Sequence, residues 1–448
     1  MKKREIIIVI CVIAFGVIYN AVESGDFEIR FYEGCSVNSR SLLDRRYPND
    51  FPREERQYTY ADIKKIEINN PAGEITVETF TDTGSGAGDG IRVKPLVRVY
   101  HRKANKAVKI DKKIDIVTSQ KDEKLSITLK PGDDFPYRRV RVHFEIAIPG
   151  AVELDLLNRY GDIKIEGCGK NIALDVKHGD ISVKQVDSNI KIRHRHGAVV
   201  LQGVEGKIDL YSRYSVIGVK DAGALKLDCS HARVTANGIR KETHIDYAAY
   251  SSIKMDGAND GVTIEGRHTK IKLGNINGGV KIKNSHDSIT MEDIAGNINI
   301  GARHCRIRMA QVVSEGVVIK NSYANIDIEG ITAKTLDILT VQGNVDIAVD
   351  GMEERINIKD RHARILLNYP PSMQPLFNIN SEYGTIIDKT SVGYTILKEK
   401  QRQSLNTPEG KPEVIIDNPY GTTLLKNTRE EPEKIEIKKV ETEKFEEA

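Results

Sequence analysis

Tryptophan is absent from this chain and the other large aromatic side chains are scarce, so the sequence lacks the residues on which a globular enzyme core usually leans. Only nine residues are Phe, and aromatic residues make up 6% of the chain. Isoleucine, by contrast, occurs 55 times in 448 residues. Because β-branched residues pack well on pleated sheets, the composition favours strands.

The chain also lacks an excess of charge of one sign. Lys and Arg number 67 against 64 Asp and Glu, a net charge of +3 that argues against a dedicated nucleic-acid binder. A 39% hydrophobic and 29% charged composition excludes a multi-span membrane protein and wholesale disorder. The five cysteines are too few and too widely spaced for a disulfide framework.

Enzyme motifs are missing as well. The sequence contains no Gly-x-Ser-x-Gly, Walker, His-Glu-x2-His or Cys-x2-Cys motif, and no Ca²⁺-binding nonapeptide. It therefore predicts no catalytic residue, no metal site and no cofactor, and indicates that the protein is not an enzyme.

The N-terminus carries an export signature. Lys2, Lys3 and Arg4 precede an apolar run from Ile6 to Ile18 that extends to Val22, so residues 1–22 are predicted to be a signal anchor or signal peptide. An uncleaved anchor is favoured because there is no Ala-x-Ala site; a buried core helix is the alternative. The bulk of the chain would then lie outside the cytoplasm, in the periplasm or at the cell surface.

The rest of the chain divides by composition. Residues 23–57 are predicted to be a spacer, 58–150 an N-terminal β region and cap, and 151–425 a run of repeats. Residues 426–448 carry eight Glu against six Lys or Arg and are predicted to form a charged flexible tail, with partner binding as an alternative role.

The repeat is the most informative feature. A marker position recurs at intervals of 17 to 21 residues, and twelve of its thirteen members are His or Tyr. The markers are Tyr160, His178, His196, Tyr214, His231, Tyr250, His268, His286, His304, Tyr323, Gln342, His362 and Tyr383. His and Tyr together make up only 28 of 448 residues, so chance would place fewer than one of them in thirteen positions.

Apolar pairs keep the same register around the markers, except that the pair before Tyr250 slips by one residue to Ile245/Tyr247. One pair stands six and four residues before it, as in Leu154/Leu156, and another three and five residues after it, as in Ile163/Ile165. Each pair reads as a short strand with one buried face, and stacked units bury what a single unit cannot. The sequence thus predicts an all-β fold, a parallel β-solenoid (β-helix) of about 13 coils with ~18-residue repeats and two strands per coil.

Two segments outside the main run fit the same template. Residues 66–77, with Ala72 at the marker position, read as a degenerate first coil. Val414, Ile416 and Tyr420 read as a last, capping coil, which would cover the open edge of the solenoid.

The order of these motifs resembles a known family. The segments are 66–77 (IEINNPAGEITV), 142–149 (VHFEIAIP) and 156–163 (LLNRYGDI), after an N-terminal anchor. Over about residues 60–425 the chain resembles the bacterial toast-rack family of uncharacterised β-solenoids, also labelled "putative adhesin". The resemblance implies an envelope-located, non-catalytic solenoid, linked in some members to surface attachment or envelope stress. It supplies no catalytic residue.

The twelve His and Tyr markers form a candidate structural ladder. By alternation they share the inward parity of the preceding pair, so we expect planar rings stacked at a corner of the core, each hydrogen-bonding a turn. Metal binding by His178 with His196, or by His268, His286 and His304, is a weaker alternative because a straight ladder diverges. A pH response of the imidazoles is a third hypothesis.

A basic column stands just before the markers and is a candidate polyanion-binding site. Its members are Arg159, Lys177, Arg195, Arg213, Arg267, Arg303 and Arg361. The alternative is a solvated face balanced by acidic neighbours. The stripe would suit an acidic glycan or lipid head groups.

The sequence as a whole predicts an exported, membrane-tethered, non-catalytic solenoid that acts as a structural or adhesin-like interaction surface in a bacterial cell envelope. Its partners would be an envelope polymer or a membrane protein, with no nucleic acid. One alternative is a glycan-modifying enzyme on the same scaffold, for which Asp162 and Asp180 align on neighbouring coils. Another is a sensor partner of an envelope-stress membrane system.

Overall fold

The computed structural model describes residues 50–52, 56–80, 90–130 and 139–427. The predicted anchor, most of the spacer and the charged tail beyond residue 427 lie outside these residues. In the described part of the chain, no helix is both long enough and apolar enough to cross a membrane.

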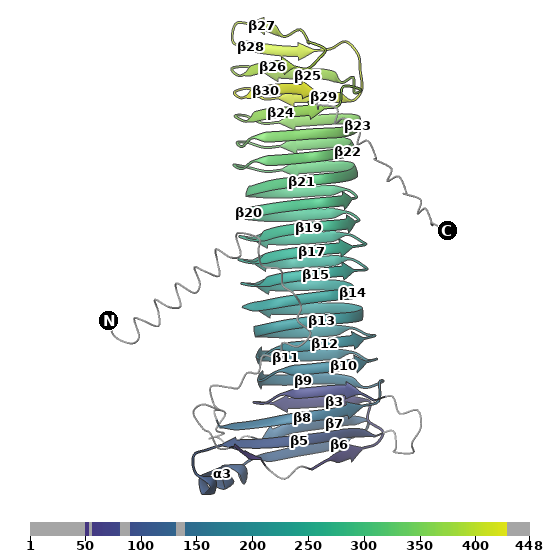
Figure 1. The fold of residues 1–448 in the computed structure, drawn as a ribbon, viewed down its shortest axis with the longest axis vertical. Helices are drawn as coiled ribbons and strands as arrows, with labels where there is room; N and C mark the ends of the chain where they lie inside the picture. The colour runs from purple at the N-terminus through teal and green to yellow at the C-terminus, as the bar shows by residue number, and fades with distance from the viewer. Residues whose placement is uncertain (1–49, 53–55, 81–89, 131–138, 428–448) are drawn as a thin grey trace, which may run out of the picture. The chain divides into compact units, whose positions relative to one another are not determined.

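Each coil pairs with the next coil in parallel and in register. Ile163 lies opposite Ile181, and Ile172 lies opposite Ile190, a displacement of one eighteen-residue period. The predicted parallel β-solenoid is therefore confirmed, with about 12 turns stacked as in Figure 1. Because the register equals the sequence repeat, each side chain lies on its equivalent in the neighbouring coil.

The main stack is built from strands β9 to β24, several of which continue round a turn. Their bounds are β9 Glu153–Tyr160, β10 Ile163–Cys168, β11 Ile172–His178, β12 Ile181–Val186, β13 Ile190–Arg213, β14 Ser215–Ser230, β15 Arg233–Ile239, β16 Thr243–Ala249, β17 Ser252–Ala258, β18 Val262–Arg267, β19 Lys270–Asn277, β20 Val280–Ala295, β21 Ile298–Lys320, β22 Ile326–Leu339, β23 Val345–Lys359 and β24 Arg364–Tyr369.

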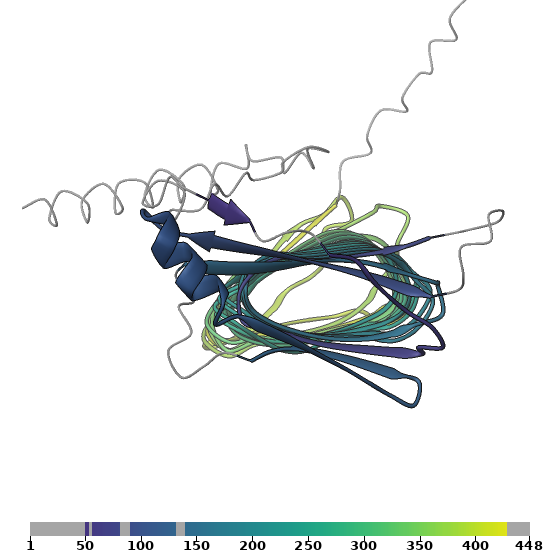
Figure 2. The same cartoon turned by 90° about the horizontal axis from the view of Figure 1, so that it is seen from below.

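The core runs through the middle of the coils. Seen along the stack, the coils superpose as a flattened oval whose two long sides are the two sheets (Figure 2). The apolar pairs predicted from the repeat point into it; Leu154, Leu156 and Ile163 are fully buried. Columns of aliphatic side chains thus fill the oval, and burial of this surface drives folding.

The N-terminal end interleaves coils from different parts of the chain. The bounds here are β1 Asp50–Pro52, β2 Tyr58–Tyr60, β3 Lys65–Asn70, β4 Ile75–Thr79, β5 Ile91–Tyr100, α3 Ala104–Asp111, β6 Asp115–Lys121, β7 Lys124–Lys130 and β8 Val140–Ile148. Strands β3 and β4 lie between β7 and β8 on one side and β9 and β10 on the other, all parallel. Antiparallel β5 and β6 then cover β8 and β7.

At the C-terminal end a coil is likewise inserted between coils from other parts of the chain. Its bounds are β25 Leu376–Ser381, β26 Thr385–Lys389, β27 Leu397–Glu399, β28 Arg402–Asn406, β29 Glu413–Asp417 and β30 Thr422–Asn427. Strands β29 and β30 insert between β23–β24 and β25–β26. The expectation that this coil caps the stack is therefore wrong: antiparallel β27 and β28 lie beyond it, on β25.

The tight turns between the sheets predict that alanine substitutions at two glycines differ sharply in their effect on folding stability. Gly161 has φ +140°, and a Cβ there would lie 2.1 Å from the Gly73 carbonyl oxygen of the neighbouring coil. We expect Gly161→Ala to destabilise the fold by roughly 4 kcal/mol or more, through backbone strain and a clash that cannot relax. Denaturant unfolding measures this loss.

Gly393 provides the control, since its φ is +69° and a Cβ there would meet nothing within 4 Å. Gly393→Ala should cost only about 1–2 kcal/mol, the penalty of a left-handed alanine. Equal losses from the two variants would contradict the account of close coil contact at Gly161.

Candidate functional site: a ring ladder beside a basic column

The marker residues lie at the corner where the chain leaves one sheet for the other. In the coils from Tyr160 to Tyr323 this corner contains a left-handed residue. In the first coils it is the glycine after the ring, as at Gly161, Gly179 and Gly197, with φ of +140°, +149° and +132°. From Tyr214 to Tyr323 the ring residue itself has a positive φ, from 50° to 64°.

The rings face outward, so the expected inward orientation is wrong. Tyr160 is 36% exposed, Tyr214 55% and Tyr323 50%. Simple alternation of side chains assumes extended backbone, and from Tyr214 to Tyr323 the left-handed ring residue interrupts it. The ladder therefore lies on the surface and not at a core corner.

A row of buried polar residues, two positions before the ring, occupies the inside of the corner and was missed in the sequence. It includes Asn70, Asn158, His194, Ser212, Asn284, Asn321, Thr340, Asp360, Ser381 and Asn418. The Asn158 amide donates to the Gly73 and Gly161 carbonyls, both at 2.9 Å, and so ties two coils together. The missed signal is the polar residue that repeatedly ends the first apolar pair.

The rings stack face to face along the solenoid. From Tyr160 to Tyr323, ten rings stand with neighbouring centroids 4.5–5.3 Å apart and planes within 24°. Gln342 interrupts the series. Beyond it, Tyr420 lies between His362 and Tyr383, because the inserted β29–β30 coil separates those two markers.

The stacking determines which parts of the rings are exposed for interactions with a ligand. Each inner ring face is covered by its neighbours, so the ladder presents mainly ring edges, with the Tyr hydroxyls and His nitrogens as polar groups. In the described residues no group of three or more His, Cys, Asp or Glu side chains is placed to hold a metal ion. The ladder is therefore a row of hydrogen-bonding edges.

The seven residues of the basic column are all exposed. Arg159, Lys177, Arg195 and Arg213 stand on four consecutive coils, whereas Arg267, Arg303 and Arg361 are separated by coils with Ser, Ala or Val. The guanidinium of Arg159 lies 5.5 Å from the Tyr160 ring centroid, and that of Arg213 lies 5.1 Å from the Tyr211 ring. The predicted column is thus a block of four followed by isolated members.

Some exposed basic residues of this sheet are ion-paired and others are not. Salt bridges join Lys226 to Asp246 and Lys283 to Glu265 on the same sheet. Lys177, Arg195 and Arg213 have no carboxylate within salt-bridge distance among the described residues. A concavity of ≈ 430 Å³ beside them is lined by Lys191, Ile192, Arg193, Asp209 and Tyr211.

The positive field of the block reaches the ladder. The pKa of His178 is lowered, first by partial burial and then by repulsion from His196, Arg195, Arg159 and Lys177. Burial likewise lowers the pKa of His194, whose ring bonds Gly179, Ser212 and Ser215.

The aligned carboxylates and the cysteines have structural roles. Asp162 accepts a hydrogen bond from the Asp180 backbone N–H at 2.9 Å, and Asp180 accepts one from the Ala198 N–H at 2.7 Å. Burial raises the pKa of Asp162. Cys229 and Cys305 are buried, with thiol pKa values raised to about 12 and about 11, so they remain protonated.

Both histidines predict acid sensitivity. Their folded-state pKa values lie below the ordinary value of 6.5, so the unfolded chain takes up these protons at higher pH than the folded chain. Stability should be full above about pH 6.5 and should fall as the pH drops through 6.5 toward the folded-state values. Thermal unfolding from pH 8 to pH 5 measures this.

The variant His178→Tyr keeps a stacked ring, as the ladder has at Tyr160, but removes one titrating group. This variant should lose less thermal stability than the unaltered protein as the pH falls. A thermal unfolding midpoint that is constant from pH 8 to pH 5 in the unaltered protein would refute the role given to the two histidines.

The fold and this edge define a parallel β-solenoid that displays a ladder of stacked rings. The sequence matches the family Toastrack DUF4097 over residues 63–417, and the chain belongs to that family. The resemblance drawn from the motifs is therefore confirmed. A search of curated proteins finds no match.

Three solved structures are similar to this chain. A "putative cell adhesion protein" from Clostridium sporogenes is 9% identical with a TM-score of 0.17, covering 84% of this chain and 100% of that one. A "putative adhesin" from Bacteroides fragilis is 10% identical with a TM-score of 0.19, covering 85% and 99%. A "putative adhesin" from Parabacteroides merdae is 12% identical with a TM-score of 0.21, covering 67% and 95%.

Proposed function

We propose that this protein is an exported, membrane-tethered, non-catalytic surface that binds an anionic polymer of the bacterial cell envelope. The observation that supports the proposal most directly is the block Arg159, Lys177, Arg195 and Arg213. Lys177, Arg195 and Arg213 have no carboxylate within salt-bridge distance among the described residues, although the charge of Arg213 acts on the nearby Asp228 carboxyl, and the four residues repeat at the coil spacing. A linear polyanion can engage several of them at once.

The affinity for such a polymer would come from the number of ion pairs formed along one chain. A single exposed ion pair contributes only about 0–1 kcal/mol and is screened by salt. Contacts linked along one polymer add, because each contact raises the effective concentration of the next anionic group. The cavity lined by Lys191 and Arg193 extends the positive surface sideways, which gives the polymer room beside the column.

A catalytic role finds less support. Asp162 and Asp180, the aligned carboxylates, each accept a backbone hydrogen bond from the next coil. Their spacing follows the repeat and does not break it. We therefore infer that the solenoid acts as a display surface.

Charge reversal tests the polymer site. The variant Lys177→Glu with Arg195→Glu should weaken binding to isolated envelope polymers at least tenfold, because attraction becomes repulsion. Full-length protein in mild detergent is co-sedimented with the polymers at low and high salt. High salt should abolish the wild-type binding.

The matched control is Lys254→Glu with Lys272→Glu, the same charge change on paired neighbouring coils of the second sheet. It should bind like the unaltered protein. Absence of wild-type binding at both salt concentrations would overturn the proposal and favour a protein partner.

Export depends on the apolar segment at residues 6–18. Val12→Asp should leave the protein in the cytoplasmic fraction, since a central acidic residue disfavours membrane insertion by about 2.5–3.5 kcal/mol. Val37→Asp in the spacer is the control and should fractionate normally. Membrane fractionation with protease added to spheroplasts reports both, and unchanged membrane association of Val12→Asp would refute the tether.

A further inference from the structure

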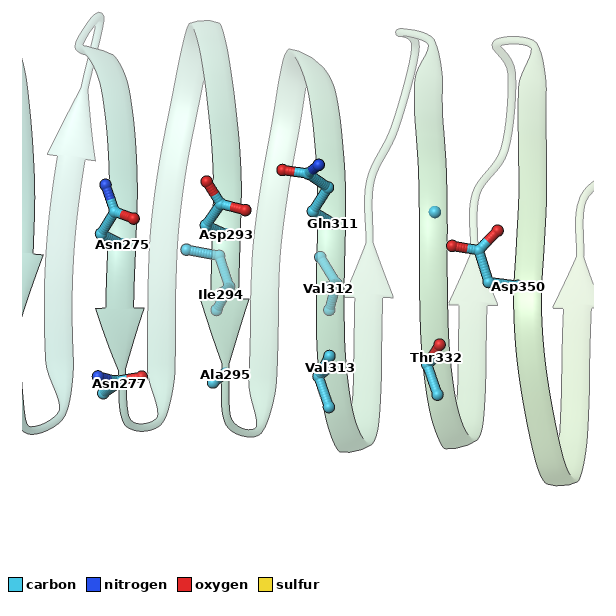
Figure 3. Close-up of a pocket in the computed structure, with 11 residues that line it drawn as sticks. Asn275, Asn277, Asp293, Ile294, Ala295, Gln311, Val312, Val313, Thr332 and Asp350 are labelled. Carbon is cyan, nitrogen blue, oxygen red and sulfur yellow. The ribbon is translucent and has the colours of Figure 1, made fainter. Parts of the chain in front are cut away.

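A groove runs across five coils at the turn that follows the second strand. It encloses ≈ 460 Å³ and is lined by two rows of side chains. Figure 3 shows Asn275, Asp293 and Gln311 in one row, with Asp350 beyond them. This turn is the one opposite the ring ladder in each coil, so the groove is separate from the basic column.

The second row lies in register along the stack. Asn277 pairs with Ala295, Ala295 with Val313, and Val313 with Thr332. Val313 is 62% exposed. Ala295 and Val313 therefore form a small apolar strip beside the polar row.

Three residues of the polar row have a left-handed backbone, which is unfavourable for residues with a side chain. Asn275, Asp293 and Gln311 have φ of 52°, 53° and 52°. The same position in other coils is often a left-handed glycine, as at Gly167, Gly203, Gly238, Gly257 and Gly330.

Left-handed backbone is unfavourable for a residue with a side chain, least so for Asn and Asp. Elsewhere among the described residues of this edge, the left-handed residues with side chains are Gln185 and Asp221, and glycines hold the position in the coils on either side of each. Three consecutive coils carry polar side chains only in the groove. Strain of this kind points to binding.

The polar atoms of the groove are available. Asp293, Gln311 and Asp350 are exposed and have no side-chain hydrogen bond or ion pair among the described residues, whereas Asn275 donates to Asp256. No Lys or Arg lines the groove. Amides and carboxylates donate to and accept from hydroxyl groups, and two carboxylates disfavour an anionic ligand.

The distance between successive polar groups of the groove indicates which class of linear polymer could match it. The polar groups recur once per coil, about every 4.8 Å, whereas an extended peptide advances by only about 3.3 Å per residue. A pyranose unit of an extended β-linked chain advances by nearly one coil spacing. Its hydroxyls would meet the polar row while its C–H face packs on Ala295 and Val313.

We propose that this groove binds a neutral, linear, β-linked polysaccharide lying along the stack, one sugar unit per coil. Gly330 has no side chain in the row, and the Asp350 carboxylate lies over it, since a Cβ at Gly330 would be 3.0 Å from that carboxylate. The site is independent of the proposed polyanion surface.

The test uses cellohexaose and chitohexaose as probes, titrated calorimetrically into full-length protein in mild detergent. The variant Asp293→Gly with Gln311→Gly removes both side chains and relieves backbone strain, so it should fold. We expect its dissociation constant for the bound oligosaccharide to rise at least tenfold. Because the ligand is neutral, high salt should leave wild-type binding unchanged.

The matched control, Gln185→Gly with Asp221→Gly, makes the same change on the same edge outside the groove, and should bind like the wild type. The proposal would be overturned if neither oligosaccharide bound the wild type. It would also be overturned if both double variants weakened oligosaccharide binding equally. Binding of spermine in place of the sugars would overturn it in favour of a linear cation.

Discussion

Parallel, in-register pairing between successive coils is the constraint on which everything else depends. Once Ile163 lies opposite Ile181, the other positions of the repeat lie on their equivalents as well, apart from local bulges such as the one near Ile245. Core aliphatics then form columns, and so do rings, basic residues and turn residues. A substitution in one coil therefore changes one step of a column, and a surface function arises from the same residue type occurring at neighbouring steps.

The two turns of each coil use this constraint differently. At the ring corner, buried polar groups such as Asn158 bond the backbone of two coils and allow the rings to face solvent. At the other turn, a left-handed residue is either a glycine or a polar side chain held out over the surface. One edge thus presents nitrogen- and hydroxyl-bearing ring edges beside positive charge, and the other presents amides and carboxylates beside a small apolar strip.

Sequence reasoning reached the fold because the apolar pairs repeat with a single slip, before Tyr250, and strand pairing follows their period. It gave the wrong orientation for the rings because alternation assumes extended backbone, and residues such as Tyr214 adopt a left-handed conformation that no spacing reveals. It also misplaced the coil around Tyr420, since strand insertion depends on long-range pairing. The polar row around Gln311 was missed because its significance lies in φ angles.

The interleaved ends have a mechanical consequence. In an ordinary stack, tension on a chain end peels off the outermost coil, one strand pair at a time. Here the last described strands, β29 and β30, are each paired on both sides. The first coil, β3 and β4, is enclosed in the same way. A pull on the C-terminal end must therefore shear both interfaces of β30 together. At the N-terminal end β1 and β2, each paired with β5 alone among the described strands, detach before the doubly paired β3 bears the load.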